Sequence, residues 1–102
     1  MGKDIILKVH KSYRWVVAVC DEELLGRKLV DGKRALDLSG QFFKGETMNC
    51  DEVRKEVSRC KDEDATFNFV GKRSVKIAKE LEIVNDESVI EIEGIPFALV
   101  LL

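Results

Sequence analysis

The sequence predicts an α+β fold, in which a mixed β-sheet is covered on one face by two amphipathic helices. Three observations lead to this prediction. Strand-like runs separated by turn residues lie at both ends of the chain, as expected for an N-terminal and a C-terminal hairpin. Two segments in the second half carry apolar residues at helical spacing. The second of these segments lies between strand patterns, so residues 66–93 form a candidate βαβ unit.

The length and composition predict a single α+β domain spanning residues 1–102. With 45% hydrophobic residues the chain can bury a substantial core. A net charge of −2 argues against wholesale wrapping by nucleic acid, which requires many cations. The charge is uneven, because residues 1–49 hold nine cations against seven anions. A local basic patch is compatible with this distribution.

Three cysteines without a repeating spacing do not predict a disulfide framework, and reduced thiols indicate a cytoplasmic protein. No apolar stretch is long enough for a signal-peptide core or for a membrane span. His10 and Cys20 would lie ~16 Å apart along a hairpin, and Cys50 and Cys60 would lie about 15 Å apart along a helix. We therefore expect no metal site and no cofactor.

Residues 4–20 predict the N-terminal hairpin, with two strand-like runs around a turn at residues 11–14. If Ser12 and Tyr13 form the centre of the turn, six apolar residues share one face. The expected cross-strand pairs are Val9 with Val16, Leu7 with Ala18, and Ile5 with Cys20.

The segment after the hairpin predicts short elements. Asp21 is a candidate N-cap and Gly26 a stop signal for one or two helical turns. The dipeptide at residues 31–32, Asp-Gly, predicts a tight turn that leads into a short strand at about residues 34–38. Residues 39–48 show no clear pattern, and Phe42 and Phe43 are expected there either to be buried or to form an exposed aromatic tip.

Asn49 predicts the start of the clearest helix. Glu52, three residues later, completes an Asn version of the capping box. The face opposite the apolar stripe is charged throughout, so we expect this helix to lie on the surface of the protein. The apolar stripe consists of Cys50, Val53, Val57 and Cys60.

The remaining residues predict a strand at 66–70, a second amphipathic helix at 74–84, and the C-terminal hairpin. Apolar and acidic residues alternate in residues 88–93, which predicts a strand with one solvated face. Residues 94–96 turn the chain into an almost wholly apolar last strand. We expect that strand to be central and covered on both faces.

Three segments of the chain, VVAVCDEELLGRKL, FVGKRSVKIA and VIEIEGIPFALV, together resemble a family of small archaeal proteins catalogued as a conserved domain of unknown function. The similarity covers nearly the whole chain in the same order. It implies an archaeal, cytoplasmic, single-domain protein and supplies no activity. Many relatives carry a histidine where this chain has Phe97, so histidine chemistry is not implied there. Cys50 and Cys60 do not belong to the family pattern.

The stretch FVGKRSV, residues 69–75, carries a glycine, two cations and a hydroxyl at the start of the second helix. Helix N-termini favour anions, and Lys72 and Arg73 would add charge-assisted contacts to a phosphate. The stretch lacks the first glycine and the spacer of a P-loop, which argues against a nucleotide hydrolase. Alternatively, Gly71 permits a turn, Ser74 caps the helix and the cations are solvated. The candidate contacts are Gly71, Lys72, Arg73, Ser74 and Lys76.

A second basic stretch, GRKLVDGKR, spans residues 26–34. If it folds against residues 72–79, the two stretches form one basic surface able to hold a structured RNA. Alternatively, its cations are only solvated. Its candidate contacts are Arg27, Lys28, Lys33 and Arg34, and the aromatic residues that could stack on bases are Tyr13, Trp15, Phe42 and Phe43.

These observations favour a non-enzymatic module that binds RNA or a ribonucleoprotein, plausibly a ribosome-associated component of translation. The competing hypothesis is a protein-interaction module with an apolar surface at Phe42 and Phe43. A third hypothesis is an enzyme or binder for a small anionic ligand. No catalytic grouping can be drawn around His10, the only histidine, so the sequence favours binding over catalysis.

Overall fold

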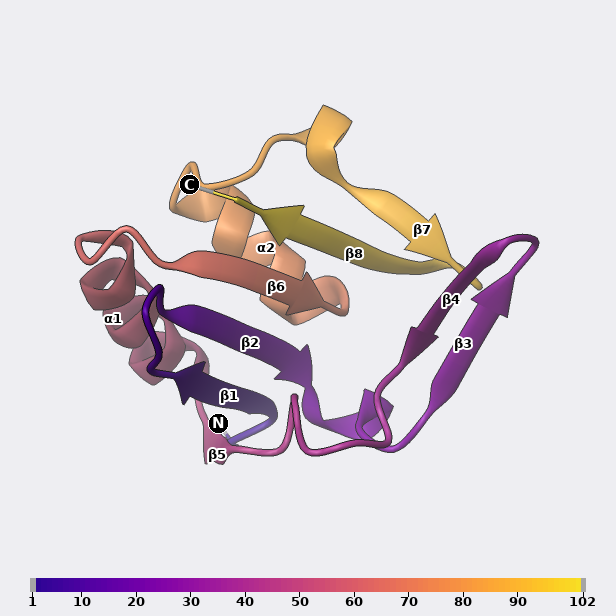
Figure 1. Ribbon diagram of the computed structural model, residues 1–102, viewed down its shortest axis with the longest axis horizontal. Helices are drawn as coiled ribbons and strands as arrows, with labels where there is room; N and C mark the ends of the chain where they lie inside the picture. The colour runs from indigo at the N-terminus through magenta and orange to yellow at the C-terminus, as the bar shows by residue number, and fades with distance from the viewer. Residues whose placement is uncertain (1, 102) are drawn as a thin grey trace.

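The computed structural model describes residues 2–101 and has one six-stranded mixed sheet, one two-stranded sheet and two α-helices (Figure 1). The predicted α+β class is therefore confirmed. The elements, in chain order, are β1 (Ile5–His10), β2 (Val16–Asp21), the 3-10 turn η1 (Glu22–Leu24), β3 (Lys28–Asp31), β4 (Arg34–Asp37), β5 (Glu46–Met48), α1 (Cys50–Lys61), β6 (Thr66–Val70), α2 (Lys72–Glu80), the 3-10 turn η2 (Asp86–Ser88), β7 (Ile90–Ile92) and β8 (Ile95–Val100).

The large sheet has the strand order β5-β1-β2-β6-β8-β7. Both predicted hairpins are confirmed, because β1 pairs antiparallel with β2 and β7 pairs antiparallel with β8. The predicted βαβ unit runs through β6, α2 and β7, which point the same way, and β8 is inserted between the two strands. β2 and β6 are parallel neighbours, a crossover that the sequence patterns did not indicate.

Two apolar clusters lie on opposite faces of the large sheet. α1 and α2 cover one face, where Val53, Val57 and Ile77 pack against Phe67 and Phe69. The β3–β4 hairpin and the segment that follows it cover part of the other face. That second cluster consists of Ala18, Cys20, Leu24, Leu29, Leu38, Phe43, Val70 and Ile92.

α1 begins as the sequence predicts. The side chain of Asn49 accepts a hydrogen bond from the Glu52 amide at 2.8 Å, and the Glu52 carboxylate accepts one from the Asn49 amide at 3.0 Å. This reciprocal pair is the predicted capping box. The predicted strand at residues 66–70 and the strand near residues 34–38 are also present.

The predicted register of the N-terminal hairpin is wrong by one residue. Leu7 lies opposite Val19, and Val9 lies opposite Val17. A shift of one residue moves a strand's side chains to the other face, so Ala18 and Cys20 belong to the second cluster rather than to the cluster beneath the helices. The difference arises because the loop at residues 11–15 is longer than a two-residue turn.

Two predictions at the C-terminal end are also corrected. The second helix spans Lys72–Glu80 rather than residues 74–84. β8 is not covered on both faces, because Leu99 is 51% exposed; Leu101, which follows the strand, is 74% exposed. Within residues 2–101 there is no helix with both the length and the apolar character that a membrane span requires.

Candidate functional site

The N-terminus of α2 is occupied by a carboxylate of the protein itself. Asp21, the last residue of β2, is 2% exposed. Its Oδ1 accepts hydrogen bonds from the Ser74 amide at 2.9 Å and from the Ser74 hydroxyl at 2.8 Å, and its Oδ2 accepts one from the Arg73 amide at 3.1 Å. A negative charge here complements the helix dipole and the free N–H groups. Asp21 thus fills the position that a phosphate would take.

Gly71 allows this close approach. Its φ of +106° lies in the region that favours glycine, and a Cβ atom built on it would lie 2.3 Å from the Asp21 Cγ atom. The predicted roles of Asp21 and Ser74 therefore change. Asp21 makes no side-chain cap to η1, and Ser74 is a buried residue inside α2 whose hydroxyl donates to Asp21.

Arg73 is engaged within the protein. Its guanidinium forms ion pairs with Glu23 and with Asp4, the latter at 3.3 Å, and it also donates to the Asp4 carbonyl at 3.3 Å. Burial alone would raise the pKa of Glu23, but its backbone hydrogen bond and the Arg73 guanidinium outweigh burial and lower it. Arg73 therefore joins α2 to η1 and to the residue that precedes β1.

The three lysines of α2 are exposed, and one of them, Lys79, pairs with Asp86. Lys72, Lys76 and Lys79 line a shallow depression of about 280 Å³ between α2 and the β7–β8 turn. Gly94 and Pro96 form the opposite wall, which also carries the Glu91 carboxylate. Two of the predicted contacts, Lys72 and Lys76, therefore share one surface.

The β3–β4 hairpin carries the second basic stretch and touches the same turn. The Val30 amide donates to the Glu93 carboxylate at 2.7 Å, and the Glu93 amide donates to Asp31 at 3.4 Å. Cations and carboxylates alternate on this hairpin, since Lys28 lies opposite Asp37 and Arg34 lies opposite Asp31. The two basic stretches thus border one turn, with carboxylates between them. Arg27, Lys28, Lys33 and Arg34 are all exposed.

The two adjacent phenylalanines have different environments. Phe43 is 4% exposed and belongs to the second cluster, so the prediction that it contributes to an interaction surface is wrong. Phe42 is 41% exposed and stacks on His10 with a ring-centre separation of 4.7 Å. The His10 Nε2 atom lies 2.8 Å from the Phe42 carbonyl oxygen. These contacts hold the segment after β4 against the end of β1.

The outer edge of β8 is only partly paired. β7 pairs with Ile95–Phe97, and no hydrogen bond among residues 2–101 joins a backbone group to Leu99 or Leu101 on that side. Asn68 lies opposite Leu99 on the inner side. Leu99 and Leu101, the residue that follows β8, are both exposed.

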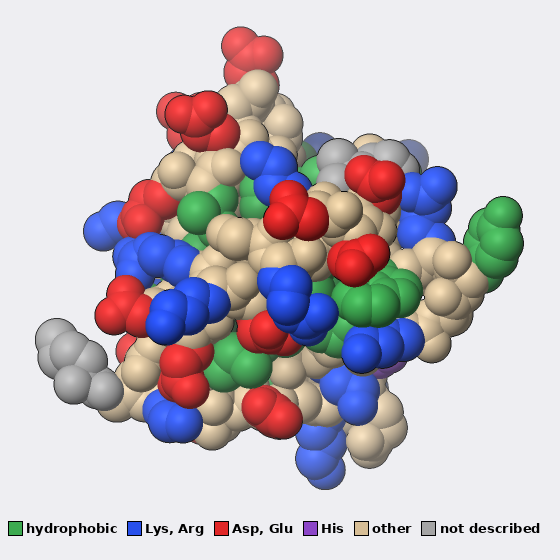
Figure 2. Space-filling model, turned by 90° about the vertical axis from the view of Figure 1, so that its left-hand side faces the viewer, with side chains coloured by type: hydrophobic (Ala, Val, Ile, Leu, Met, Phe, Trp, Pro, Cys, Tyr) green, Lys and Arg blue, Asp and Glu red, His purple; other side chains and the backbone are tan. Residues whose placement is uncertain are grey.

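Two short connecting segments of the chain are acidic. Residues 62–64, which precede β6, and residues 82–87, which precede β7, each contain three carboxylates and no lysine or arginine. In Figure 2, which faces the end of the molecule where α1 lies in Figure 1, the topmost side chains are acidic. Elsewhere on this face Figure 2 shows acidic and basic side chains interspersed. This end offers no extended basic surface.

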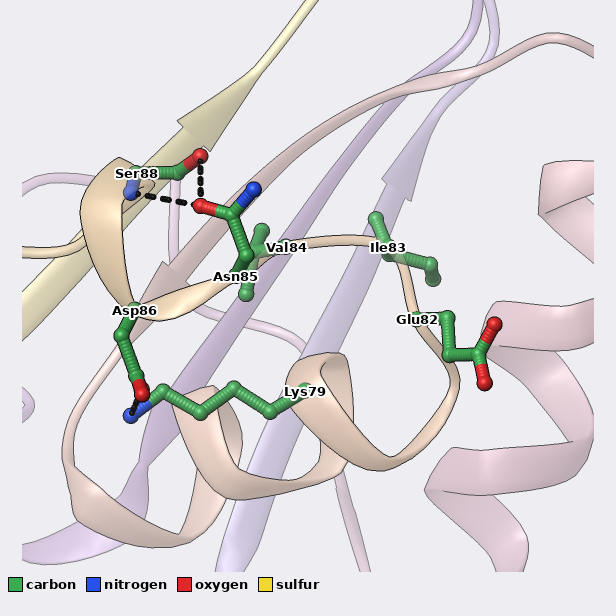
Figure 3. A pocket seen from close by; sticks show the side chains of 7 residues that line it. All are labelled: Lys79, Glu82, Ile83, Val84, Asn85, Asp86 and Ser88. Carbon is green, nitrogen blue, oxygen red and sulfur yellow. Dashed lines mark hydrogen bonds and ion pairs between the residues drawn. The ribbon is translucent and has the colours of Figure 1, made fainter.

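A depression of about 460 Å³ lies beside the segment that follows α2 (Figure 3). Its polar groups bond one another, because Lys79 pairs with Asp86 at 2.7 Å and the side-chain Oδ1 of Asn85 accepts from the Ser88 amide at 3.0 Å. These contacts fold the segment into η2. The depression is therefore better explained as part of the loop structure than as a ligand site.

The Lys79–Asp86 pair makes a testable pH prediction. The hydrogen bond from Lys79 lowers the pKa of Asp86. Because the folded-state pKa is depressed, the stabilising effect is present above the unfolded-state pKa and is lost as the pH falls through the folded-state pKa. In Lys79→Gln, NMR titration should show the Asp86 pKa rising toward its ordinary value, while Asp37, held low by Ser39, is unchanged. An unchanged Asp86 pKa would contradict the pairing.

Two of the three thiols, Cys20 and Cys60, are buried. Burial, together with the Asp21 and Glu23 carboxylates, raises the pKa of the Cys20 thiol to about 12. Burial also raises the pKa of Cys60. Among residues 2–101, no set of three or more histidine, cysteine or acidic side chains is placed to hold a metal ion. Such thiols are protonated at neutral pH and are poor nucleophiles.

Sequence patterns assigned Asp21 to the wrong helical segment and did not indicate the partly paired edge of β8. Asp21 is 52 residues from Arg73, and only the parallel pairing of β2 with β6 brings it to the start of α2. One signal was available in the sequence. Gly71, which precedes two cations, has no side chain that could cap α2, so the cap had to come from another residue. The edge of β8 is only partly paired because β7 is short. The length of β7 could not be predicted from the alternation of apolar and acidic residues alone.

Comparison with known proteins identifies a family and one similar fold. A family model described as "Protein of unknown function (DUF424)" matches residues 10–102. A crystal structure of an uncharacterized conserved protein from Methanopyrus kandleri, an archaeon, is similar, with a TM-score of 0.82 and 24% identity over 93% of this chain and 88% of that one. No curated protein sequence matched. The predicted resemblance is thus confirmed, and the structural likeness supports the fold alone.

Proposed function

We propose, from the premise that this chain belongs to the DUF424 family of proteins of unknown function, that it is a protein-interaction module. The contact surface is the outer edge of β8 and the exposed leucines beside it. The family description supplies no activity, so the argument depends on the surfaces of this chain. A partner protein would cover the apolar side chains of Leu99 and Leu101.

One observation carries this proposal: Leu99, on the part of β8 that β7 does not pair, and Leu101, the residue after the strand, are both exposed apolar side chains. Long apolar sheet edges promote association, and proteins usually block them with charges, bulges or covering segments. Here the exposed fractions of Leu99 and Leu101 are 51% and 74%. Burying about 100 Å² of apolar surface contributes roughly 2.5 kcal/mol to binding before the costs of association.

The experiment compares matched variants of a tagged chain in an extract of its source organism. We expect a partner protein to be recovered with the unmodified chain. The recovered amount should fall at least fivefold with the double variant Leu99→Lys/Leu101→Lys. Val30→Lys is the matched control, because Val30 is an exposed apolar strand residue, at 59%, located in the β3–β4 hairpin. Phe42→Ser tests the exposed aromatic ring in the same way.

Circular dichroism and thermal unfolding of each variant establish that its fold is intact. Rebinding of the recovered protein to the purified variants then gives affinities. Equal recovery with all variants, or a loss that Val30→Lys causes equally, would overturn the proposal.

A second candidate function, binding of RNA or a ribonucleoprotein, is favoured by the lysines of α2. Lys72 and Lys76 line one depression, and the basic β3–β4 hairpin borders the same turn. Arg73 and Ser74 bond to groups within the protein, so the phosphate contacts would come from these lysines and from Lys28, Lys33 and Arg34. Neighbouring carboxylates limit the expected affinity, which should depend steeply on salt.

Titration of ribosomal RNA at several salt concentrations tests this second function. We expect the logarithm of the binding constant to fall linearly with the logarithm of the salt concentration, with a slope that corresponds to a few phosphate contacts. Lys72→Ala/Lys76→Ala should reduce the magnitude of this slope by about one to two. The matched control is Lys55→Ala/Lys61→Ala on α1. Absence of binding at low salt would reject RNA binding. The third hypothesis, a small anionic ligand, receives less support, because Asp21 fills the N-terminus of α2.

A further inference from the structure

We propose that a depression beside the loop between β1 and β2 binds the guanidinium group of an arginine side chain on a partner protein. The depression has a volume of about 360 Å³ and is lined by Tyr13, Arg14, Trp15, Glu63 and Asp64. Aromatic rings and carboxylates are the groups with which a guanidinium interacts best. The proposal goes beyond the contact at β8, because none of these residues belongs to that strand.

Tyr13 supplies an aromatic face that no other side chain uses. It lies in the middle of the loop between β1 and β2, and its side chain is fully exposed. Within residues 2–101 its ring stacks on no other ring and carries no cation. Tyrosine is enriched at contact surfaces. The face of its ring attracts cations, and a planar guanidinium can stack on it.

Trp15 forms the part of the depression that packs against the core beneath the helices. Its half-buried ring already has two cations of the protein near it. The Lys11 Nζ atom lies 4.8 Å from the ring centre, and the Arg59 guanidinium carbon lies 5.8 Å from it. The incoming guanidinium would therefore stack on Tyr13, next to a tryptophan that can report its arrival.

The charges around the depression favour a cationic ligand. Glu63 and Asp64 are exposed, and neither carboxylate forms an ion pair within residues 2–101. The nearby cations are balanced, because Arg59 pairs with Glu56 at 2.8 Å. The hydrogen bond from Arg59 and the charge of Lys11 both lower the pKa of that glutamate. The two unpaired carboxylates are therefore available to a guanidinium from outside.

The depression is preformed, because hydrogen bonds join the two segments that line it. The Arg14 Nη1 atom donates to the Asp64 carbonyl oxygen at 3.3 Å, and the Thr66 amide donates to the Trp15 carbonyl oxygen at 2.9 Å. Arg14 is thus engaged within the protein. Two carboxylates against this one guanidinium leave the lining with a net charge of −1. A site that is already ordered loses little entropy when it binds a ligand.

A nucleobase and a lysine side chain are the two alternative ligands. A base could stack on Tyr13, but its phosphates would then lie near Glu63 and Asp64 and would be repelled. A lysine could pair with the carboxylates, but its ammonium group is compact and strongly hydrated and does not stack on a ring as a guanidinium does. Arginine is the ligand that uses both the ring and the carboxylates.

Fluorescence of Trp15 tests the proposal, because the chain's only tryptophan lines the depression. The probe is the acetylated and amidated peptide Gly-Arg-Gly-Arg-Gly, which has no fluorescent side chain. We expect a saturable change in tryptophan emission at low salt and a loss of affinity as salt is added. The same peptide with citrulline in place of arginine should bind at least fivefold more weakly, because citrulline is uncharged. The lysine peptide should bind about threefold more weakly.

Matched variants test whether the peptide binds in this depression. Tyr13→Ser should weaken the affinity about threefold to fivefold, whereas Tyr13→Phe keeps the ring and should retain it. Glu63→Gln/Asp64→Asn should weaken the affinity about fivefold at low salt. Glu22→Gln/Glu87→Gln removes two exposed carboxylates outside the depression and should change little. Thermal unfolding establishes that each variant is folded.

Four results would overturn the proposal. They are equal affinity for the arginine and citrulline peptides, equal affinity for the arginine and lysine peptides, an unchanged response in Tyr13→Ser, and tighter binding of oligouridylate than of the arginine peptide. Leu99→Lys/Leu101→Lys should bind the arginine peptide normally. Failure of this proposal can therefore be distinguished from failure of the contact at β8.

Discussion

Asp21→Ala is expected to lower the free energy of unfolding by about 3–5 kcal/mol, since it leaves three hydrogen-bond donors without an acceptor. These are the backbone amides of Arg73 and Ser74 and the Ser74 hydroxyl. Ser74 is fully buried, so water cannot readily replace the carboxylate. The variant also removes the negative charge at the start of α2. Denaturant unfolding followed by circular dichroism measures the change.

Two companion variants make the Asp21 prediction specific. Asp37→Ala removes another carboxylate that bonds a serine, but in an exposed turn, so its cost should be below about 1 kcal/mol. The double variant Asp21→Ala/Ser74→Ala should have a free energy of unfolding about 1 kcal/mol higher than that of Asp21→Ala, because it also removes the unpaired buried hydroxyl. Equal costs for Asp21→Ala and Asp37→Ala would show that Asp21 does not hold the start of α2.

Gly71→Ala is expected to cost about 3–5 kcal/mol for two separate reasons. The backbone of Gly71 has φ of +106° and ψ of 160°, a conformation that is essentially restricted to glycine and costs other residues about 1–3 kcal/mol. In addition, the new methyl group would lie 2.3 Å from the Asp21 Cγ atom. The Asp21 side chain is buried and hydrogen-bonded, so it cannot move away to relieve this clash. Thermal and denaturant unfolding measure the total cost.

Gly26→Ala isolates the backbone contribution. Gly26 has φ of +91°, but no atom lies within 4 Å of an added Cβ. Its cost should therefore be limited to about 1–3 kcal/mol of backbone strain. In an Asp21→Ala background, Gly71→Ala should cost less than it does alone, because the clashing carboxylate is gone. Identical costs for Gly71→Ala and Gly26→Ala would contradict the close approach to Asp21.

Local elements could be predicted because their causes lie within a few residues. The apolar spacing of Val53 and Val57 and the Asn49–Glu52 capping box together locate α1 to within a residue. The hairpins and the strand at residues 66–70 follow equally from alternation and turn residues. The predicted start of α2, residue 74, was two residues too late, because the cap of this helix comes from Asp21, which is remote in the sequence.

Candidate sites were harder to predict, because a site depends on which segments meet. The sequence placed Lys72 and Lys76 together, and both line one depression. It could not show that Arg73 is held by Glu23 and Asp4. Nor could it distinguish Phe42 from Phe43, since two adjacent residues in an irregular segment carry no periodicity that separates a buried ring from an exposed one.

By itself the sequence determined the fold class, the two helices, the two hairpins and the family resemblance, because short-range spacing and capping specify these. Only the tertiary structure decided the hairpin register, the pairing of Asp21 with α2 and the position of β8 beside the short edge strand β7. These features depend on contacts between residues that are far apart in the chain. Their energies arise from burial and from hydrogen bonds that exist only after the sheet has assembled.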